Sequence, residues 1–172
     1  MLDHDPKTIA LAALKNQLMS AGLNRYLPFS TVGQMGATPY LFRSGFNGGI
    51  AFGEDVRGQD YPRELLRQGI AEGKRIRKFF HGNFYPLSEA NTDPRDWCVL
   101  QYHLPYERTG MVLAFRRDQS PYGSYDCSLR EIEPSAAYQV RMYHSYDPEP
   151  PVTMTGSVTK VCDGVLSPEL FD

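Results

Sequence analysis

Short apolar runs fill the second half of the sequence, and they constrain the fold more than any other feature. Four runs of six or seven residues follow one another, and turns rich in Pro, Gly, Asp and Ser separate them. Runs of this length and spacing are typical of an antiparallel sandwich or barrel. A weaker last strand is expected near Val152–Val161. The four runs are 97–103, 110–116, 125–130 and 138–143.

Two helices are expected in the first half of the chain. The first covers roughly the first twenty residues, because Asp5 can cap it and Pro6 suits the first helical position. Gly22 favours its end. The second helix is expected over 61–80, where apolar residues recur on one face, and Gly82 ends it.

Between these helices, glycines separate short apolar runs at 26–29, 40–44 and 50–52. This pattern favours short strands joined by glycine-rich loops, which often carry binding sites. The sequence therefore predicts an α+β protein, in which a short helical segment of residues 1–87 precedes an antiparallel β-sandwich of residues 88–172. The polar stretch around 87–96, with two prolines, marks the boundary.

The charge balance excludes several classes of partner. The chain has 172 residues, with 18 Lys and Arg against 20 Asp and Glu, so the net charge is -2. This argues against nucleic acid as the main partner and gives no reason to expect a membrane partner. The basic cluster Lys74–Lys78 is therefore interpreted as a solvated helix face, in preference to an RNA contact. Neither a transmembrane stretch nor a secretory signal is found, so a cytoplasmic location is expected.

The sequence offers few groups for independent chemistry. The four histidines have no metal-ligand spacing, so no metal or cofactor is predicted. There is no G-x-S-x-G motif, and Cys98 in an apolar strand is expected to be a buried, inert thiol. The three cysteines suggest free thiols in a reducing compartment. The glycine-rich 45–49 stretch lacks both common phosphate-loop patterns.

Two other features have a structural and a functional interpretation. Glu54 and Asp55 are adjacent, so they would point to opposite faces of a strand and make a poor catalytic pair. One carboxylate bridged to Arg43 or Arg57 is favoured instead. The aromatic 79–86 segment could be a platform for a sugar, but an interface between the two halves is preferred.

Several segments together resemble the α-galactosidase-like enzymes of glycoside hydrolase family 36, over about residues 20–160. One of them, F-H-G-N-F-Y-P-L, is similar to the family's segment at the junction of barrel and sandwich, with Asn83 in place of the usual Asp. The segments are 40–47, 53–57, 80–87, 97–102, 110–117, 120–122, 129–138 and 154–156.

The resemblance implies retaining hydrolysis by two aspartates in the complete family enzyme. This chain lacks the Ser-Asp pair of the acid/base and the motif of the nucleophile, so no catalytic residue is predicted. A (β/α)₈ barrel needs about 200–250 residues, and only the remnant of its last units would fit before residue 87. The chain therefore resembles a C-terminal fragment or a shortened relative.

The resemblance also suggests which residues would face a sugar in the complete enzyme. Barrel sites lie at the C-terminal ends of strands. If Leu41–Arg43 is such a strand, its end and the end of the next strand carry the candidate substrate-binding residues. These are Arg43, Ser44, Asn47, Asp55 and Arg57.

We therefore expect the C-terminal, non-catalytic portion of an α-galactosidase-like hydrolase, inactive by itself, whose carbohydrate partner binds the complete enzyme. An exposed half-barrel edge favours self-association. The alternative is a stand-alone β-sandwich module that binds carbohydrate or protein. An exposed aromatic strip on one sheet face would distinguish this module from the enzyme portion. The candidate residues are Tyr102, Tyr106, Tyr122, Tyr125 and Tyr143.

Overall fold

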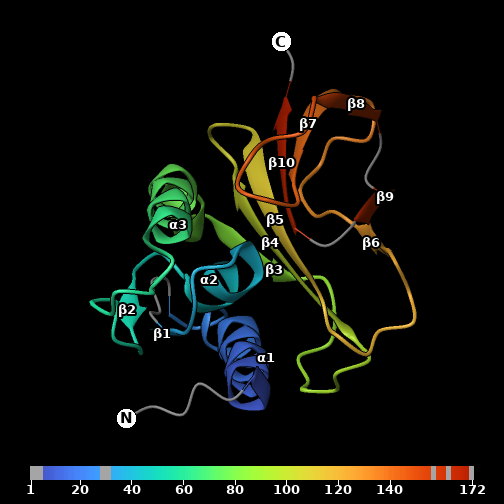
Figure 1. Cartoon of the computed structure of the whole chain (residues 1–172). Coiled ribbons are helices and arrows are strands. Elements are labelled where there is room, and N and C mark those ends of the chain that lie inside the picture. Colours follow the sequence, from blue (N-terminus) through green and yellow to red (C-terminus); the bar gives the residue numbers. More distant parts are fainter. Residues whose placement is uncertain (1–5, 28–31, 156–157, 162–163, 171–172) are drawn as a thin grey trace.

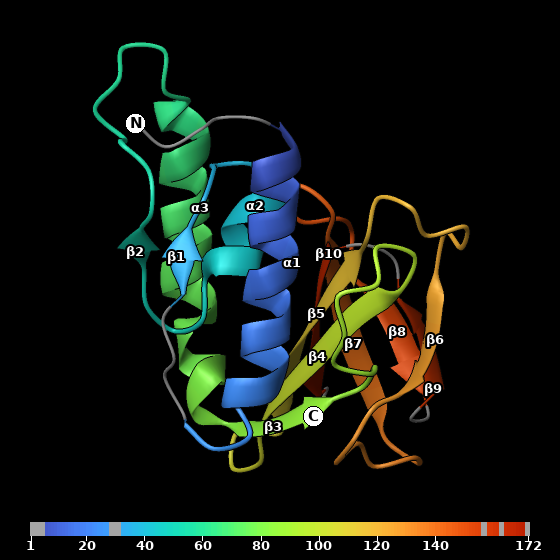
Figure 2. The same ribbon diagram turned by 90° about the horizontal axis from the view of Figure 1, so that it is seen from below.

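The computed structural model describes residues 6–27, 32–155, 158–161 and 164–170. Three helices lie on one face of a six-stranded antiparallel sheet, and a two-stranded ribbon lies on the other (Figures 1 and 2). The helical side contains α1 (Pro6–Leu23), β1 (Gly33–Gln34), α2 (Pro39–Gly45), β2 (Ala51–Phe52), α3 (Arg63–Ile76) and the 3-10 turn η1 (Arg77–His81). The sheet side contains β3 (Asn83–Pro86), β4 (Trp97–Leu104), β5 (Thr109–Arg116), β6 (Tyr125–Ser128), β7 (Ala137–Tyr143), β8 (Val152–Thr155), β9 (Val158–Val161) and β10 (Gly164–Leu170).

The large sheet has the strand order β3-β4-β5-β10-β7-β8, with every neighbouring pair antiparallel. The last strand of the chain, β10, therefore lies between β5 and β7 and joins the two halves of the sheet. β6 pairs with β9 in the separate ribbon. The α+β class and the antiparallel second half are confirmed. A sandwich of two extended sheets stays a prediction, since only this ribbon faces the sheet among the described residues.

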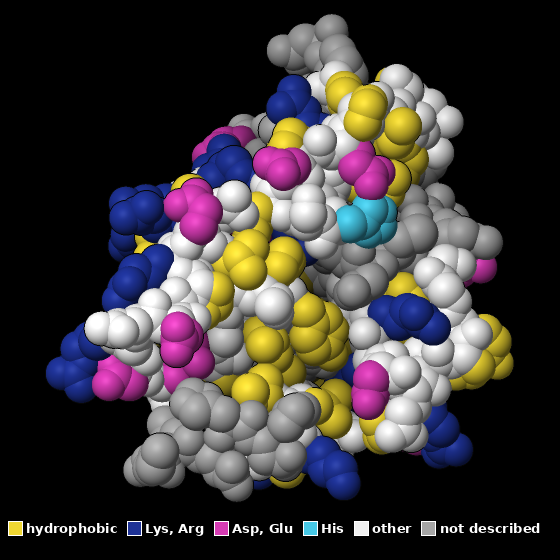
Figure 3. Space-filling view, in the orientation of Figure 1, with side chains coloured by type: hydrophobic (Ala, Val, Ile, Leu, Met, Phe, Trp, Pro, Cys, Tyr) yellow, Lys and Arg dark blue, Asp and Glu magenta, His cyan; other side chains and the backbone are white. Residues whose placement is uncertain are grey.

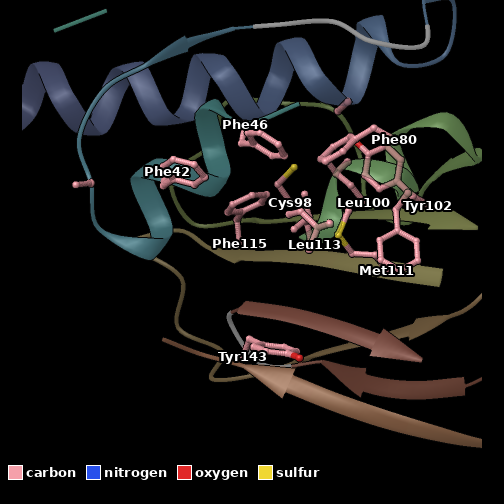
Figure 4. Packing of buried hydrophobic residues seen from close by; sticks show 14 of the residues in the cluster. Phe42, Phe46, Phe80, Cys98, Leu100, Tyr102, Met111, Leu113, Phe115 and Tyr143 are labelled. Atoms are coloured by element: carbon pink, nitrogen blue, oxygen red, sulfur yellow. The ribbon is translucent and has the colours of Figure 1, made fainter. Parts of the chain in front are cut away.

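β4 and β5 form the centre of the fold because both of their faces are buried. Seven of the eight residues in each strand are buried. Such continuous burial explains why neither strand alternates between apolar and polar residues. Cys98, Leu100 and Tyr102 face the helices, as Figure 4 shows, whereas Trp97 and Val99 join a second cluster on the ribbon side.

Helices α2 and α3 pack closely because two glycines of α3 allow close approach. A Cβ at Gly69 would lie 2.7 Å from the Phe42 ring, and a Cβ at Gly73 would lie 2.9 Å from the Phe46 ring. Phe42 and Phe46 stack on each other between α3 and the sheet. The helical layer and the sheet therefore share one hydrophobic core.

The strand predicted over 40–44 is wrong: these residues form α2. Thr38 is the N-cap, and its side chain accepts a hydrogen bond from the Leu41 amide at 3.4 Å. Pro39 follows at the first helical position, where its missing N–H costs nothing. The apolar residues of this short run thus face the core from a helix.

Other predicted elements are largely confirmed. α1, α3 and the strands at 97–103, 110–116, 125–130 and 138–143 lie where expected, within a few residues. Asp5 and part of the 26–29 run lie outside the described residues. The weak strand near the end is two strands, β8 and β9, while β3 and β10 were not expected. Because β3 pairs with β4, the boundary at 87/88 stays a prediction.

Candidate functional site

A buried salt bridge connects the helices to the sheet side of the molecule. The Arg43 guanidinium on α2 donates two hydrogen bonds to the Glu72 carboxylate on α3, at 2.9 and 2.8 Å. It also donates to the backbone carbonyls of His144 and Ser145, which follow β7, at 3.3 and 2.6 Å. The two side chains are only 3 % and 2 % exposed. Arg43 therefore joins three segments that are distant in sequence.

A second hydrogen-bonded group of buried polar side chains includes Ser44, the residue after Arg43. The Ser44 hydroxyl donates to the Tyr40 carbonyl at 2.8 Å and accepts from Gln17 Nε2 on α1 at 3.0 Å. Gln17 Oε1 accepts from Arg117 Nε, just after β5, at 3.2 Å. We call the buried set Gln17, Arg43, Ser44, Asn47, Glu72 and Arg117 the polar junction.

Arg117 extends the polar junction to the segment between β3 and β4. Its guanidinium donates to the Asn91 side-chain oxygen at 2.7 Å, to the Asn91 carbonyl at 2.7 Å and to the Asp93 carbonyl at 2.8 Å. With 1 % of Arg117 exposed, these bonds satisfy a charge that would be costly to bury without partners. The junction thus fixes a long connection against α1 and β5.

Asn47 lies at the other end of the junction, beneath the end of α1. The side-chain amides of Asn47 and Asn24 exchange hydrogen bonds at 2.9 Å in both directions. Asn24 also donates to the Tyr102 hydroxyl on β4 at 2.6 Å. Burial raises the pKa of Tyr102 well above its usual value. Asn47 therefore helps to attach the end of α1 to the sheet.

Asp55 and Arg57 lie apart from the junction, in the exposed loop between β2 and α3. Their side chains form an ion pair at 2.8 Å, with 61 % and 87 % exposure. Hydrogen bonds from the Arg57 side chain and backbone lower the pKa of Asp55 to about 2. The predicted bridge between a carboxylate and Arg57 is confirmed. Glu54 instead accepts from the Gly36 amide at 2.7 Å and from the Tyr61 hydroxyl.

The structure thus divides the five predicted substrate-binding residues into two groups. Arg43, Ser44 and Asn47 are all buried in the polar junction, where each is hydrogen-bonded to different protein groups. Asp55 and Arg57 lie in the loop and do not contact that group. A role for any of the five in sugar binding stays a prediction.

Three members of the junction, Gln17, Glu72 and Arg117, were missed from the sequence. Glu72 had a detectable signal, because it falls on the same face of α3 as the buried residues Gly69 and Ile76. A carboxylate on an apolar face requires a buried partner. Arg117 had no such signal, since its position just beyond a strand is equally typical of a solvated residue.

The aromatic 79–86 segment is an interface between the helices and the sheet, as preferred from the sequence. Phe79 and Phe80 are buried. The ring of Tyr102 lies 4.7 Å from that of Phe80 between centroids (Figure 4). It lies 5.1 Å from the ring of Phe84. These rings fill the shared core, so they do not form an exposed platform.

The same segment contributes to a surface cluster around Glu131. The Glu131 carboxylate accepts hydrogen bonds from the Tyr85 hydroxyl and from the Asn83 amide, and it lies 2.8 Å from His103 Nδ1. Hydrogen bonds from Tyr85, then from His103 and Asn83, lower the pKa of Glu131. Glu131 has a φ of 55°, a conformation that a non-glycine residue adopts at a cost.

Hollows of modest size lie around the helices. One of about 190 Å³ lies between α2 and the sheet and is lined in part by Arg43, Phe115 and His144. Another, of about 340 Å³, lies near the end of α1 and includes Tyr26 and Asn83 in its lining. Within the described residues, no group of three or more His, Cys, Asp or Glu side chains could hold a metal ion.

The basic residues at 74–78 are solvated, as expected. Lys74, Arg75, Arg77 and Lys78 are all exposed, and Figure 3 shows Lys and Arg side chains along the edge of the molecule formed by α3. Arg75 lies over the Tyr143 ring at 4.1 Å. No helix in the described part of the chain combines the length and the apolar character needed to cross a bilayer.

Cys98 is the buried thiol that the sequence predicted. It is 1 % exposed, and burial raises its pKa to about 11. Cys127 is also buried, and burial raises its pKa to about 11. Both thiols are therefore protonated and poorly nucleophilic at neutral pH. Cys162 and His4 lie outside the residues whose side chains are described.

The five tyrosines proposed as an aromatic strip do not form one. Tyr102 and Tyr143 are buried, and Tyr125 is partly buried. Tyr106 and Tyr122 are exposed, but they lie beyond opposite ends of β5. An eight-residue strand is about 26 Å long, so these two rings cannot form one platform.

The fold is that of part of an α-galactosidase of glycoside hydrolase family 36, which confirms the expected resemblance. The galactosidase domain of an α-galactosidase–sucrose kinase matches 92 % of this chain, with a TM-score of 0.62 and 13 % sequence identity. An α-galactosidase from Lactobacillus brevis matches 77 %, with a TM-score of 0.57 and 14 % identity. The family 36 α-galactosidase AgaA from Geobacillus stearothermophilus matches 77 %, with a TM-score of 0.52 and 10 % identity.

Sequence comparison adds no closer relationship. No protein-family model matches the chain, and no curated protein matches it at a significant level. The chain spans between 19 and 25 % of the length of the three solved structures. The similarity therefore concerns the fold of one part of those larger proteins.

Proposed function

We propose that this chain is the C-terminal, non-catalytic portion of an α-galactosidase-like glycoside hydrolase, without activity of its own. In this proposal residues 1–87 are the last units of the barrel and residues 88–172 are a β-sandwich that supports it. The carbohydrate binds the complete enzyme, and the enzyme acts in the cytoplasm.

One observation carries the proposal: 92 % of this chain matches only 25 % of a galactosidase domain. The matched part includes both the helices and the sheet, so the likeness is not limited to a common β motif. The absence of the family's Ser-Asp pair from this sequence supports a non-catalytic role.

The polar junction supports a structural role for this portion. Arg43, Glu72 and Arg117 hold the helices to the sheet through side chains that are almost completely buried. Buried polar side chains that are hydrogen-bonded in this way favour one fixed arrangement of the layers. In the complete enzyme, the sheet would thereby hold the last helices in a defined position. The substrate-binding residues that we propose for the complete enzyme are Arg43, Ser44, Asn47, Asp55 and Arg57.

The test is the intact mass of the polypeptide in its source cell. Mass spectrometry should detect a product several times larger than the 19.5 kDa of this chain. That product should hydrolyse a chromogenic α-galactoside, and the 172-residue chain should not. A cellular product of 19.5 kDa would contradict the proposal, and a glycan-binding screen would then test the stand-alone module.

A further inference from the structure

The helix α1 lacks the usual amphipathic pattern of a surface helix, because its inner side buries polar residues beside Ala13 and Ala21. Asn16, Gln17 and Ser20 are buried on its inner side. Leu11 and Met19, on its outer side, are 47 % and 44 % exposed. A surface helix normally places its apolar stripe toward the core and its polar residues toward water. α1 lies at the front of Figure 2, and no described element covers its outer side.

The exposed side chains of α1 form a regular row. Leu11, Lys15, Met19 and Leu23 are each four residues apart and all exposed. Residues at this spacing form one of the ridges through which helices pack against each other. The row is about 18 Å long at the helical rise of 1.5 Å per residue. We call these four residues the outer ridge.

Hydrogen bonds on the inner side fix the outer ridge in its exposed position. Asn16 Nδ2 donates to the Gly33 carbonyl at 2.8 Å, and Gln17 Nε2 donates to the Tyr40 hydroxyl at 2.9 Å. Turning α1 to bury its leucines would break these bonds and leave buried polar groups unpaired, which is costly. The apolar ridge therefore cannot be removed from water by a rotation of the helix.

The charges of α1 indicate the chemistry of what covers the ridge. The helix carries Lys7 and Lys15 and has no Asp or Glu. Lys15 lies within the ridge, between Leu11 and Met19. A covering segment therefore needs apolar side chains for the leucines and methionine, together with a carboxylate for Lys15.

We propose that the outer ridge is the docking surface for an apolar helix with an acidic residue, supplied by the remaining part of a larger polypeptide. The proposal rests on the proposed function. The solved galactosidase domain has three quarters of its length beyond the part that this chain matches. When ridges of four-residue spacing interdigitate, the two helices cross at about -50°. This occupant removes the exposed apolar row from water without disturbing the bonds of Asn16 and Gln17.

The experiment replaces ridge residues in two settings. The double variant Leu11→Gln/Met19→Gln keeps good helix formers and changes only exposed side chains. The control is Leu65→Gln, because Leu65 is 37 % exposed on α3, and α2 packs between the two helices. Both variants are made in the 172-residue chain and in the complete cellular product. Thermal unfolding is measured, and acetylation of Lys15 is followed by mass spectrometry.

In the isolated chain, we expect neither variant to change Tm and Lys15 to be acetylated readily. In the complete product, the ridge variant should lower Tm by about 5 °C or more, and Lys15 should be protected at least tenfold. Leu65→Gln should change neither quantity. An unchanged Tm together with a freely acetylated Lys15 in a larger product would overturn the docking surface and leave the proposed function standing.

Two other outcomes would also overturn the proposal. A cellular product of 19.5 kDa would remove the proposed function and the docking surface together. If the isolated chain forms a dimer that the ridge variant converts to a monomer, and the larger product does not respond to the variant, the occupant is a second copy of this chain.

Discussion

The salt bridge between Arg43 and Glu72 provides the sharpest test of the polar junction. Replacing Arg43 with Met keeps much of the side-chain volume and removes the charge. The Glu72 carboxylate would then remain buried, with 2 % of its side chain exposed. Its other cationic neighbour is Arg75, at 3.5 Å and 41 % exposed, which compensates only in part. The carbonyls of His144 and Ser145 would also lose their donor.

The expected loss of stability is large. Removing one partner of a buried ion pair costs about 3–5 kcal/mol, because the remaining charge is uncompensated. Typical domains are stable by about 5–15 kcal/mol, so Arg43→Met should leave a folded but weak protein. With a urea m-value of about 2 kcal/mol/M, the midpoint should fall by about 2 M.

The double variant Arg43→Met/Glu72→Met isolates the charge effect. It removes the same donor from these carbonyls but also removes the buried carboxylate, so it should be more stable than Arg43→Met alone. Urea unfolding followed by circular dichroism measures all variants at one pH. Arg57→Met is the control, and we expect no measurable shift, because its ion pair with Asp55 is exposed to solvent.

Two results would refute this reasoning. A loss below about 1 kcal/mol for Arg43→Met would mean that the bidentate bridge contributes no more than a surface pair. A double variant as unstable as Arg43→Met would mean that the lost carbonyl bonds, and not the buried charge, determine the cost.

Three further predictions concern the sheet. Gly82→Ala should cost about 1–3 kcal/mol in thermal unfolding, because its Cβ would lie 2.2 Å from the His103 carbonyl oxygen; unchanged stability would contradict this contact. The lowered pKa of Glu131 adds stability above its unfolded pKa, and this is lost as pH falls through its folded value. Glu131→Gln should therefore be less stable than the original chain near pH 7, and the difference should shrink as the pH falls through the folded pKa; a difference in unfolding free energy that does not change with pH would disprove the assignment. Cys98 and Cys127, each with a pKa of about 11, should resist iodoacetamide at pH 8 until the protein unfolds; rapid labelling of either, mapped by peptide mass spectrometry, would contradict their burial.

The sheet was more predictable than the helical side because its signals are local. The 97–103 and 110–116 runs are mostly apolar, and both faces of β4 and β5 are buried. Two short elements escaped prediction for different reasons. β3 lies in the aromatic 79–86 segment. Aromatic rings can pack into a core from a turn as well as from a strand, so the segment carried no clear strand signal. β10 inserts between β5 and β7, and this pairing depends on contacts far apart in the sequence.

The error at 40–44 explains why the candidate site was only partly predictable. Residues 40–44 read Tyr-Leu-Phe-Arg-Ser. A segment this short fits a strand or one helical turn equally well, and hydrophobic periodicity cannot distinguish the two. The decisive signal lay outside the run, in the Thr38-Pro39 pair that caps α2. Once the segment is helical, Tyr40 and Ser44 lie one turn apart, and Arg43 lies on a different side of the helix. Ser44 can then meet Gln17 while Arg43 reaches Glu72, so the helix assigns its two polar residues to separate neighbours. The prediction of a substrate rim had instead placed both residues at the C-terminal end of a strand, and the helix removes that basis for it.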